Sequence, residues 1–329
     1  MLYDVLPILI NTILFPGLVF VGITSWLTQW FYRKLYARMQ NRVGPRFIGP
    51  YGLLQPLADF LKLLFKEDIV TVVAREKEPV LMLSLSIGAL IALLSMLPLS
   101  LFPFYAENDI VLAIYLTLWP SITLILLGFM TSNPYTVIGS SRYMSLVIVC
   151  EPIWLLSLLT PVILATRSGA KPAYSIFSAS LHTWRLWLNP IGAIVLAITL
   201  FTTVMVLQCK LMLKPFDIPE AETEIVAGLF TEYSGPKLAY IILLHDAELV
   251  VYALLISYLL LGGPAPFPLT SLPGVLVLMV KYLAIIFLIT WIKASTARLR
   301  IEQALTYMLK YTLSLSIIAI TLAVFVPLP

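Results

Sequence analysis

The chain has 329 residues, of which 60% are hydrophobic and 12% are charged, and its formal net charge is +4. A soluble domain has about 45–50% apolar and about 25% charged residues, so the composition excludes an ordinary soluble globular protein. It indicates a protein whose main solvent is the lipid bilayer. The basic residues lie in short loops between apolar runs, so we expect no nucleic-acid partner.

The two cysteines, Cys150 and Cys209, lie in or at the end of apolar runs. The sequence has no CxxC motif, no Cys/His cluster and no glycine-rich nucleotide-binding motif of the GxGxxG or GxxxxGK[ST] type. We therefore expect this chain to bind no metal ion or cofactor. If electrons move in this system, their carriers belong to other chains.

Eight apolar stretches are each long enough to cross a bilayer, which needs about 20 helical residues. They cover roughly 5–31, 79–102, 110–131, 142–166, 189–212, 237–262, 272–292 and 308–327. The first stretch is too long for the apolar region of a signal peptide, and Arg33, Lys34 and Arg38 follow it, as expected where a span ends in the cytoplasm. The fold class that we expect is all-α, a polytopic membrane helix bundle. We find no tandem repeat, so residues 1–329 are predicted to form a single membrane domain.

The basic residues are divided unequally between the two sides of the predicted bundle. With the N-terminus outside, 17 of the 21 Lys and Arg residues fall on the cytoplasmic side and three fall in the outer loops. The positive-inside rule favours this orientation. We therefore expect both termini on the outer side and the large first loop and the fifth loop in the cytoplasm.

A short amphipathic helix is expected within the first loop, over residues 52–66. Gln55, Asp59, Lys62 and Lys66 recur at steps of four, three and four residues, which places them on one face of a helix. At about 15 residues the segment is too short to span. It should lie at the membrane interface or against the bundle.

Glu151 lies near the middle of the fourth span and is followed by Pro152. A charged, unpaired carboxylate at this depth costs between about 3 and more than 10 kcal/mol. Glu151 is therefore either a buried hydrogen-bonding group that fixes helix packing or a protonatable residue of an ion pathway. The second interpretation is favoured, because acids inside a membrane usually have a function.

The sixth span carries three ionisable residues within four positions, namely His245, Asp246 and Glu248. His245 and Glu248 are three residues apart and share a helix face, whereas Asp246 points about 100° away. Packing alone does not account for such a cluster. Interacting groups of this kind titrate together and can exchange protons.

Five carboxylates lie within sixteen residues of the fifth loop, namely Asp217, Glu220, Glu222, Glu224 and Glu232. Asp217 can cap a short helix with Glu220 three residues later, but capping does not explain Glu222 or Glu224. Crowded carboxylates repel one another, which raises the pKa values of some of them. A solvated acidic surface is one interpretation, and a funnel that takes up protons or cations is the favoured one.

The first loop is basic and contains the pairs Gly44-Pro45 and Gly49-Pro50. Its arginines and lysine could simply bind anionic lipid headgroups. The two Gly-Pro pairs favour a defined turn over a loose basic tether.

Four segments of the sequence together resemble a known family. They are residues 32–45 with 49–59 and 66–68, residues 216–228 with 232–235, the set Gly139, Arg142 and Glu151, and residues 297–303 before the last span. They are similar to the quinone-proximal membrane subunit of respiratory complex I, which is the H subunit of the bacterial enzyme. The similarity extends over nearly the whole chain in the right order.

The resemblance implies an eight-helix subunit that catalyses nothing alone and joins an iron–sulfur peripheral arm to antiporter-like and small membrane subunits. It implies a redox-driven pump for protons or sodium ions in a prokaryotic cell membrane, with iron–sulfur clusters in partner subunits and quinone as a candidate ligand at the interface. With the sixth-span cluster added, the candidate ion-pathway residues are Glu151, Asp217, Glu220, Glu222, Glu224, Glu232, His245, Asp246 and Glu248. The candidate quinone-cavity or subunit-interface residues are Arg33, Lys34, Arg38, Gln40, Arg42, Gly44, Pro45, Gln55, Asp59, Arg142, Arg298 and Arg300.

The chain departs from the quinone-using members at several positions. Tyr32 stands where they have an acid, 244–246 reads Leu-His-Asp in place of Ala-Glu-Tyr, Glu302 stands where Asp is common, and Leu309 replaces Trp before Lys310. Related subunits act without quinone in membrane-bound hydrogenases and sulfur-reducing complexes, and this is the alternative function. A stand-alone proton or cation transporter is an alternative of another class, although we find no inverted repeat or paired broken helices. The buried acids disfavour a purely structural anchor.

Overall fold

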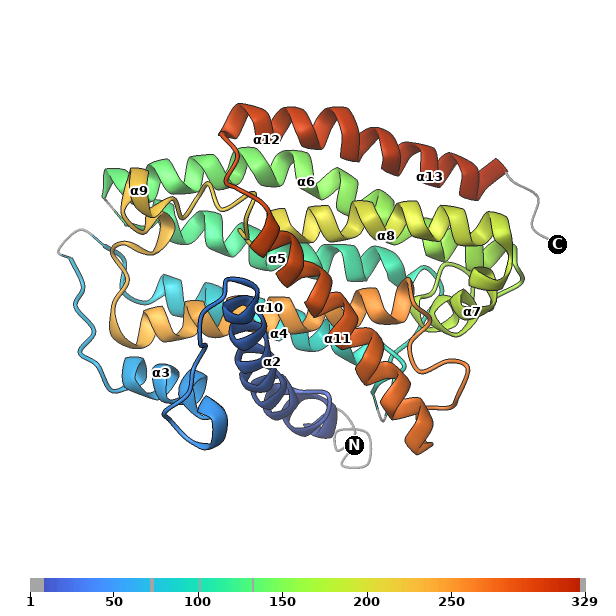
Figure 1. The fold of residues 1–329 in the computed structure, drawn as a ribbon, viewed down its shortest axis with the longest axis horizontal. Coiled ribbons are helices and arrows are strands. Elements are labelled where there is room, and N and C mark those ends of the chain that lie inside the picture. The colour runs from blue at the N-terminus through green and yellow to red at the C-terminus, as the bar shows by residue number, and fades with distance from the viewer. Residues whose placement is uncertain (1–8, 72–73, 101, 132, 326–329) are drawn as a thin grey trace.

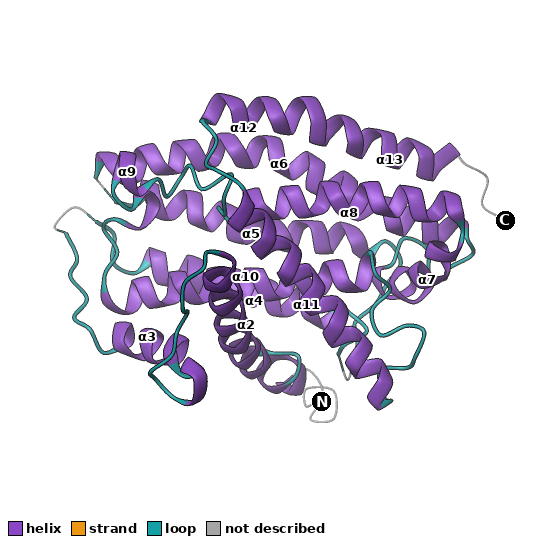
Figure 2. Cartoon of the chain, viewed as in Figure 1, coloured by secondary structure: helices purple, strands orange, loops and turns teal. Residues whose placement is uncertain are grey.

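The computed structural model describes residues 9–71, 74–100, 102–131 and 133–325 (Figure 1). Every regular element in these ranges is helical (Figure 2), which confirms the expected all-α fold. Eight helical runs are long and apolar enough to cross a membrane, as predicted. They are Ile10–Met39, Glu78–Ser95, Asp109–Phe129, Pro134–Arg167, Pro190–Lys210, Gly235–Leu259, Leu272–Ser295 and Ile301–Phe325.

Two of these runs are composite. The first consists of the π-helical turn η1 (Ile10–Leu14) and α2 (Leu18–Met39), and the last consists of α12 (Ile301–Tyr307), the π-helical turn η4 (Met308–Leu313) and α13 (Ser314–Phe325). The six others are single helices. They are α4 (Glu78–Ser95), α5 (Asp109–Phe129), α6 (Pro134–Arg167), α8 (Pro190–Lys210), α10 (Gly235–Leu259) and α11 (Leu272–Ser295).

Short helices lie at both ends of the bundle. At one end are α3 (Gln55–Leu64), where a helix is expected over 52–66, and the single turns η2 (Pro50–Gly52), α9 (Glu222–Ile225) and η3 (Gly228–Phe230). At the other end is α7 (Ile176–Leu188), a helix that is not among the expected elements. We refer to the two ends as the α9 end and the α7 end.

Local sequence signals explain where the long central helices begin. The side chains of Asn133 and Asn189 accept hydrogen bonds from the second backbone N–H of α6 and α8, and a proline follows each of them. This is the typical cap of a helix N-terminus, with proline at a position that needs no N–H partner. The cap explains why α6 begins at Pro134, well before the expected start at 142.

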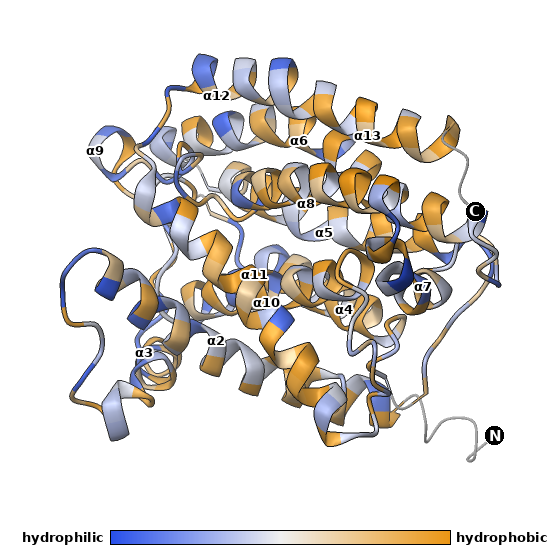
Figure 3. Ribbon diagram, turned by 45° about the vertical axis from the view of Figure 1, so that its right-hand side comes forward, coloured by the Kyte–Doolittle hydropathy of each residue, from blue (hydrophilic) through white to orange (hydrophobic). Residues whose placement is uncertain are grey.

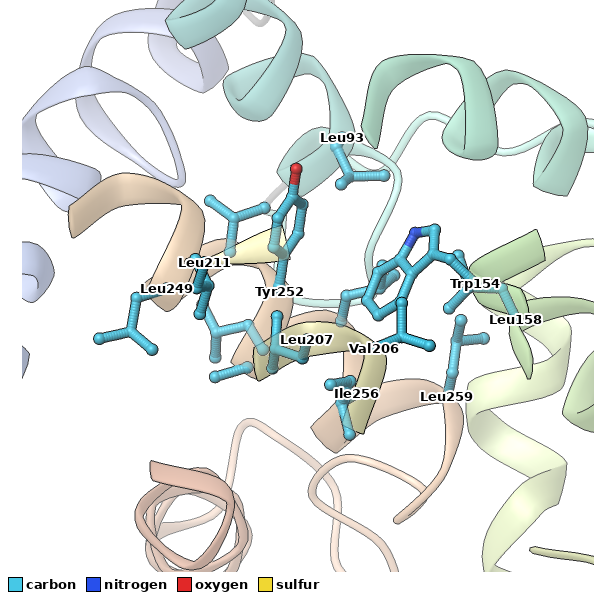
Figure 4. Packing of buried hydrophobic residues seen from close by; sticks show 14 of the residues in the cluster. Leu93, Trp154, Leu158, Val206, Leu207, Leu211, Leu249, Tyr252, Ile256 and Leu259 are labelled. Carbon is cyan, nitrogen blue, oxygen red and sulfur yellow. The ribbon is translucent and has the colours of Figure 1, made fainter. Parts of the chain in front are cut away.

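The bundle is organised around α6 and α10. Helix α6 packs against α5, α8 and α13, whereas α10 packs against α2, α4 and α11. The two groups meet in a buried core to which α4, α6, α8 and α10 contribute (Figure 4). At its centre the rings of Trp154 and Tyr252 lie 5.5 Å apart. The ionisable groups of α6, α8 and α10 are therefore held inside a packed interior.

Lys281 on α11 binds the loop that follows α10 at the α7 end of the bundle. Its Nζ donates hydrogen bonds to the carbonyl oxygens of Leu261, Gly263 and Ala265 at 2.7, 2.8 and 2.8 Å. It also lies 4.9 Å from the ring centroid of Trp184 on α7. These carbonyl groups lie just beyond Leu259, the last residue of α10, and a cation near a helix C-terminus is stabilising. A single side chain thus joins α7, α10 and α11.

Candidate functional site

Glu151 on α6 forms a buried ion pair with Lys210, the last residue of α8. The Lys210 side chain is fully buried and that of Glu151 is 18% exposed. Lys210 Nζ also donates to the backbone oxygen of Thr117 at 3.2 Å and lies 5.5 Å from the Trp154 ring centroid. Pairing with a cation is what allows a carboxylate to occupy such a position.

A second carboxylate, that of Glu248 on α10, is fully buried near the same lysine. Its Oε1 lies 3.4 Å from the hydroxyl of Tyr252, whose ring centroid is 5.7 Å from Lys210 Nζ. Its Oε2 is buried without a hydrogen-bond partner in the described part of the chain. The Nδ1 atom of His245 lies 4.0 Å from this oxygen and is also unpartnered there. Three helices thus bring one lysine and two acids together.

Asp246 lies outside this central group. It accepts a hydrogen bond of 2.6 Å from Nε2 of Gln29, which belongs to α2. Successive residues of a helix are rotated by about 100°, so Asp246 points toward α2 while Glu248 points toward the core between α8 and α10. The three ionisable residues His245, Asp246 and Glu248 therefore lie in two separate environments.

Ion pairs hold the acidic fifth loop against its neighbours at the α9 end. Asp217 accepts two hydrogen bonds of 2.8 Å from Nε and Nη2 of Arg298, and Arg142 Nη1 lies 2.5 Å from Glu224 Oε2. Bidentate bonds between arginine and a carboxylate fix orientation as well as charge. Arg142, Glu224, Arg298 and Arg300 are among the residues that line a cavity of about 190 Å³. The loop thus reaches both α6 and the segment before α12.

Backbone geometry and further polar contacts fix the rest of the loop. Gly228 has a φ of +51°, and a Cβ there would lie 1.8 Å from the carbonyl oxygen of Pro219, so no side chain can be accommodated. Glu232 accepts a hydrogen bond from the Asn133 side chain. The position of this acid is therefore tied to the start of α6.

Glu220 has the electrostatic environment of a titratable group. Burial raises the pKa of its carboxyl group to about 7, the positive charge of Lys293 opposes the shift, and Asp217 and Glu222 add to it. Glu222 itself is exposed on α9. The hydrogen bonds from Arg298 to Asp217 raise the pKa of the Arg298 guanidinium above its ordinary value. One of the fifth-loop acids can thus change its protonation near neutral pH.

The first loop folds back on α2 and α3. Arg33 Nη1 lies 2.7 Å from Asp59 Oδ2, and Gln55 Nε2 donates to Asp59 Oδ1 at 2.9 Å. Lys34 Nζ donates to the backbone oxygens of Tyr51 at 2.6 Å and Pro45 at 3.4 Å. The loop is therefore an ordered structure with α2 as its support.

The turn between α2 and η2 is compact. A Cβ at Gly44 would lie 3.2 Å from the Cα atom of Lys34, so the chain returns close to α2. Arg42 Nε donates to Gln40 Oε1 at 3.0 Å, and both residues are exposed. Arg38 is also exposed, on the last turn of α2. These charges remain available for contacts with other molecules.

Two adjoining cavities lie along α2. An apolar cavity of about 520 Å³ has walls from α2, α10 and α11, and a cavity of about 300 Å³ is lined by Lys34, Arg38 and Tyr51 among others. Trp30 and Phe31 line both cavities. An apolar space between helices thus continues to a basic site at the α9 end.

Comparison with known proteins settles the family. Residues 11–324 match the model of the family described as NADH dehydrogenase. The chain belongs to this family. It is 35% identical over 331 residues to the H subunit of NADH-quinone oxidoreductase from Thermomicrobium roseum, across 92% of this chain and 91% of the relative.

The fold is also shared with a solved structure. The match is to a chain of the membrane-bound sulfane sulfur reductase, an archaeal respiratory membrane complex, with a TM-score of 0.75, 22% identity, and coverage of 93% of this chain and 96% of that chain. The expected resemblance to the quinone-proximal subunit of complex I is thereby confirmed. This member of the NADH dehydrogenase family is an integral membrane subunit of a complex I-like oxidoreductase and part of a multi-subunit membrane complex.

Sequence reasoning missed two lysines of this NADH dehydrogenase family member. The positive-inside rule places Lys210 among the 17 cytoplasmic Lys and Arg residues. In the structure its side chain is buried against Glu151. The same rule places Lys293 on the cytoplasmic side. In the structure its Nζ packs over two rings of α2, 4.9 Å from the ring centroid of Tyr32 and 5.0 Å from that of Tyr36. The signal for Lys210 was its place inside an apolar run, beside Cys209.

The part of this family member that the structure describes contains no group of three or more His, Cys, Asp or Glu side chains that could hold a metal ion. Several of its acids, among them Glu151, Asp217 and Glu224, form ion pairs with lysine or arginine.

Proposed function

We propose that this chain couples electron transfer in partner subunits to the movement of protons or sodium ions across the membrane. One observation carries the proposal. Lys210 is bonded to the carboxylate of Glu151, while the second buried carboxylate near it, that of Glu248, has an Oε2 atom without a hydrogen-bond partner among the described residues. An unpaired buried carboxylate is costly, so the second acid holds a proton or another cation. If Lys210 moved from Glu151 to Glu248, the proton or cation on Glu248 would be released.

The fifth loop is the proposed origin of that change. Glu220 titrates close to neutral pH, and its neighbour Glu224 is paired with Arg142 on α6. Arg142 precedes Glu151 by nine residues, which is about 14 Å along the helix. A redox-driven shift of charge or conformation near the loop would therefore act on α6 and on the Glu151–Lys210 pair.

In this proposal the α9 end faces the cytoplasm and receives an iron–sulfur peripheral arm, while antiporter-like and small membrane subunits adjoin the bundle within the membrane. The excess of Lys and Arg near the α9 end supports this orientation through the positive-inside rule. The exposed Arg38, Gln40 and Arg42 would belong to the contact with the arm. The chain alone would have no redox activity.

A quinone site is a second candidate function. A molecule with a long apolar tail and a polar head would fit the cavity along α2, α10 and α11 and its continuation to Lys34 and Arg38. The expected effect of a quinone-site inhibitor is inhibition of the purified complex. Full activity with saturating inhibitor would favour a quinone-independent hydrogenase or sulfur reductase, and stoichiometric nickel would point to the hydrogenase.

The test uses the intact complex reconstituted in liposomes, with electron transfer and ion uptake measured in the same sample. We expect the Glu248→Gln and Glu151→Gln variants to lower the ions moved per electron at least tenfold while the complex still assembles. Glu107→Gln, which changes an exposed loop acid, is the matched control. Wild-type coupling in both buried-acid variants would refute the proposal. Ion transport by the isolated chain would favour a stand-alone transporter.

A further inference from the structure

Lys310 differs from the other charged residues of the spanning helices. In the described spans, the other exposed charged residues are Arg38, Arg167 and Glu302, and each lies within two residues of the end of its span. Lys310 is also exposed but is the tenth residue of Ile301–Phe325, about 14 Å along the helix from its start. Its Nζ lies 5.6 Å from the Tyr311 ring centroid. No hydrogen bond or ion pair joins this nitrogen to another described residue.

Lys310 belongs to a row of polar side chains. Gln303, Thr306, Lys310 and Ser314 follow one another at steps of three, four and four residues, and all four are exposed. This spacing places them on one face of the helix, which we call the polar stripe. Figure 3 shows hydrophilic residues along α12, whereas most of α13 is hydrophobic. The other face of this helical run packs against α6 and α8.

Two further features accompany the polar stripe. An open cavity of about 480 Å³ lies beside it, lined in part by Gln303, Thr306, Tyr307 and Tyr311. The π-helical turn Met308–Leu313 contains Lys310, and single π-helical turns within α-helices occur frequently at functional sites. The surface around Lys310 thus offers a charge, hydrogen-bonding groups and a hollow.

We propose that the polar stripe is the docking surface for a transmembrane helix of another subunit, which carries a carboxylate opposite Lys310. A charged side chain that faces hydrocarbon is costly, and an acid at the same depth would neutralise it. Ser, Thr and Gln side chains form hydrogen bonds between membrane helices. The Lys310 side chain could extend to an anionic lipid headgroup at the interface, but Ser314 lies another turn deeper and is too short to do so. The proposal rests on membership of a multi-subunit membrane complex and is independent of ion coupling.

Photocrosslinking in the intact complex tests the proposal. A benzophenone amino acid is placed at Thr306, and as a control at Leu309, which is 49% exposed, lies at the depth of Lys310 and is not part of the polar stripe. We expect the probe at Thr306 to form an adduct with a membrane subunit, within a transmembrane segment that contains Asp or Glu. Adducts with lipid alone, or equal yields of protein adduct at both positions, would overturn the proposal.

Charge variants of Lys310 provide a second measurement. We expect Lys310→Glu to lower the yield of the Thr306 adduct about tenfold and Lys310→Arg to retain it. Exchange of the partner's acid for lysine should restore the yield in the Lys310→Glu background. The amount of each variant in the membrane is measured in parallel, and the adduct yield is expressed per amount of chain present. An unchanged yield in Lys310→Glu would show that no acid faces this position.

Discussion

Replacing Lys210 by methionine tests the central network most directly. Methionine keeps an unbranched apolar side chain but removes the charge, the ion pair with Glu151 and the hydrogen bond to the Thr117 carbonyl. Removal of one partner of a buried ion pair costs about 3–5 kcal/mol, because the other charge stays buried without compensation. Since the Glu151 side chain is 18% exposed, we expect a value near the lower end, about 3 kcal/mol.

A double-mutant cycle separates this interaction from general damage to packing. Lys210→Met, Glu151→Gln and the double variant are compared in the purified complex by denaturation in detergent. The double variant leaves no unpaired charge at Glu151, so we expect it to be more stable than the sum of the single effects by about 2–3 kcal/mol. Effects that add within about 0.5 kcal/mol would show that the two groups are not coupled, and the reasoning on lysine pairing would fail.

Three further predictions concern the fifth loop. Gly228→Ala should destabilise the loop by about 2 kcal/mol or more, because an alanine there is strained and its Cβ would lie within 2 Å of a carbonyl oxygen. The control is Gly88→Ala, since no atom lies within 4 Å of a Cβ at that position. Both variants are measured by thermal denaturation. The raised pKa of Glu220, about 7 instead of 4.5, predicts loop stability that is full below pH 4.5 and is lost as the pH rises through about 7. Hydrogen exchange of the loop amides should show this loss in the wild type and not in Glu220→Gln. Arg298→Lys should weaken the contact with Asp217 by about 1 kcal/mol, because lysine cannot form the bidentate pair. Limited proteolysis of the fifth loop should then be faster. An unchanged rate of cleavage would show that Arg298 does not hold the loop in place.

The eight spans were predictable because their signal is local. A stretch of about 20 apolar residues is helical in a membrane whatever its neighbours, since the backbone must satisfy its own hydrogen bonds. Helix α7 was not predicted, since it has 13 residues, too few to span. Its sequence combines polar and apolar residues, and its place in the fold depends on contacts with α6 and α8.

The acids of the site were predictable and their partners were not. A carboxylate in an apolar run is conspicuous in the sequence, and Glu151 and Glu248 were found on that ground. Lys210 lies 59 residues from Glu151, and Arg298 lies 81 residues from Asp217. Pairing over such separations follows from how the helices pack, which composition and periodicity do not specify.

The attachment of Lys281 to the carbonyl groups of the loop directly after α10 has a mechanical consequence. A rigid helix fastened at one end moves as a lever whose pivot is the fastened end. Glu248 lies 11 residues from Leu259, the last residue of α10, and Gly235 lies 24 residues away. A displacement of α10 at the fifth loop would therefore be reduced to about half at Glu248, with the α7 end almost stationary. The displacement of Glu248 would thus depend on how far the loop moves and on how firmly Lys281 holds the chain just beyond the other end of α10.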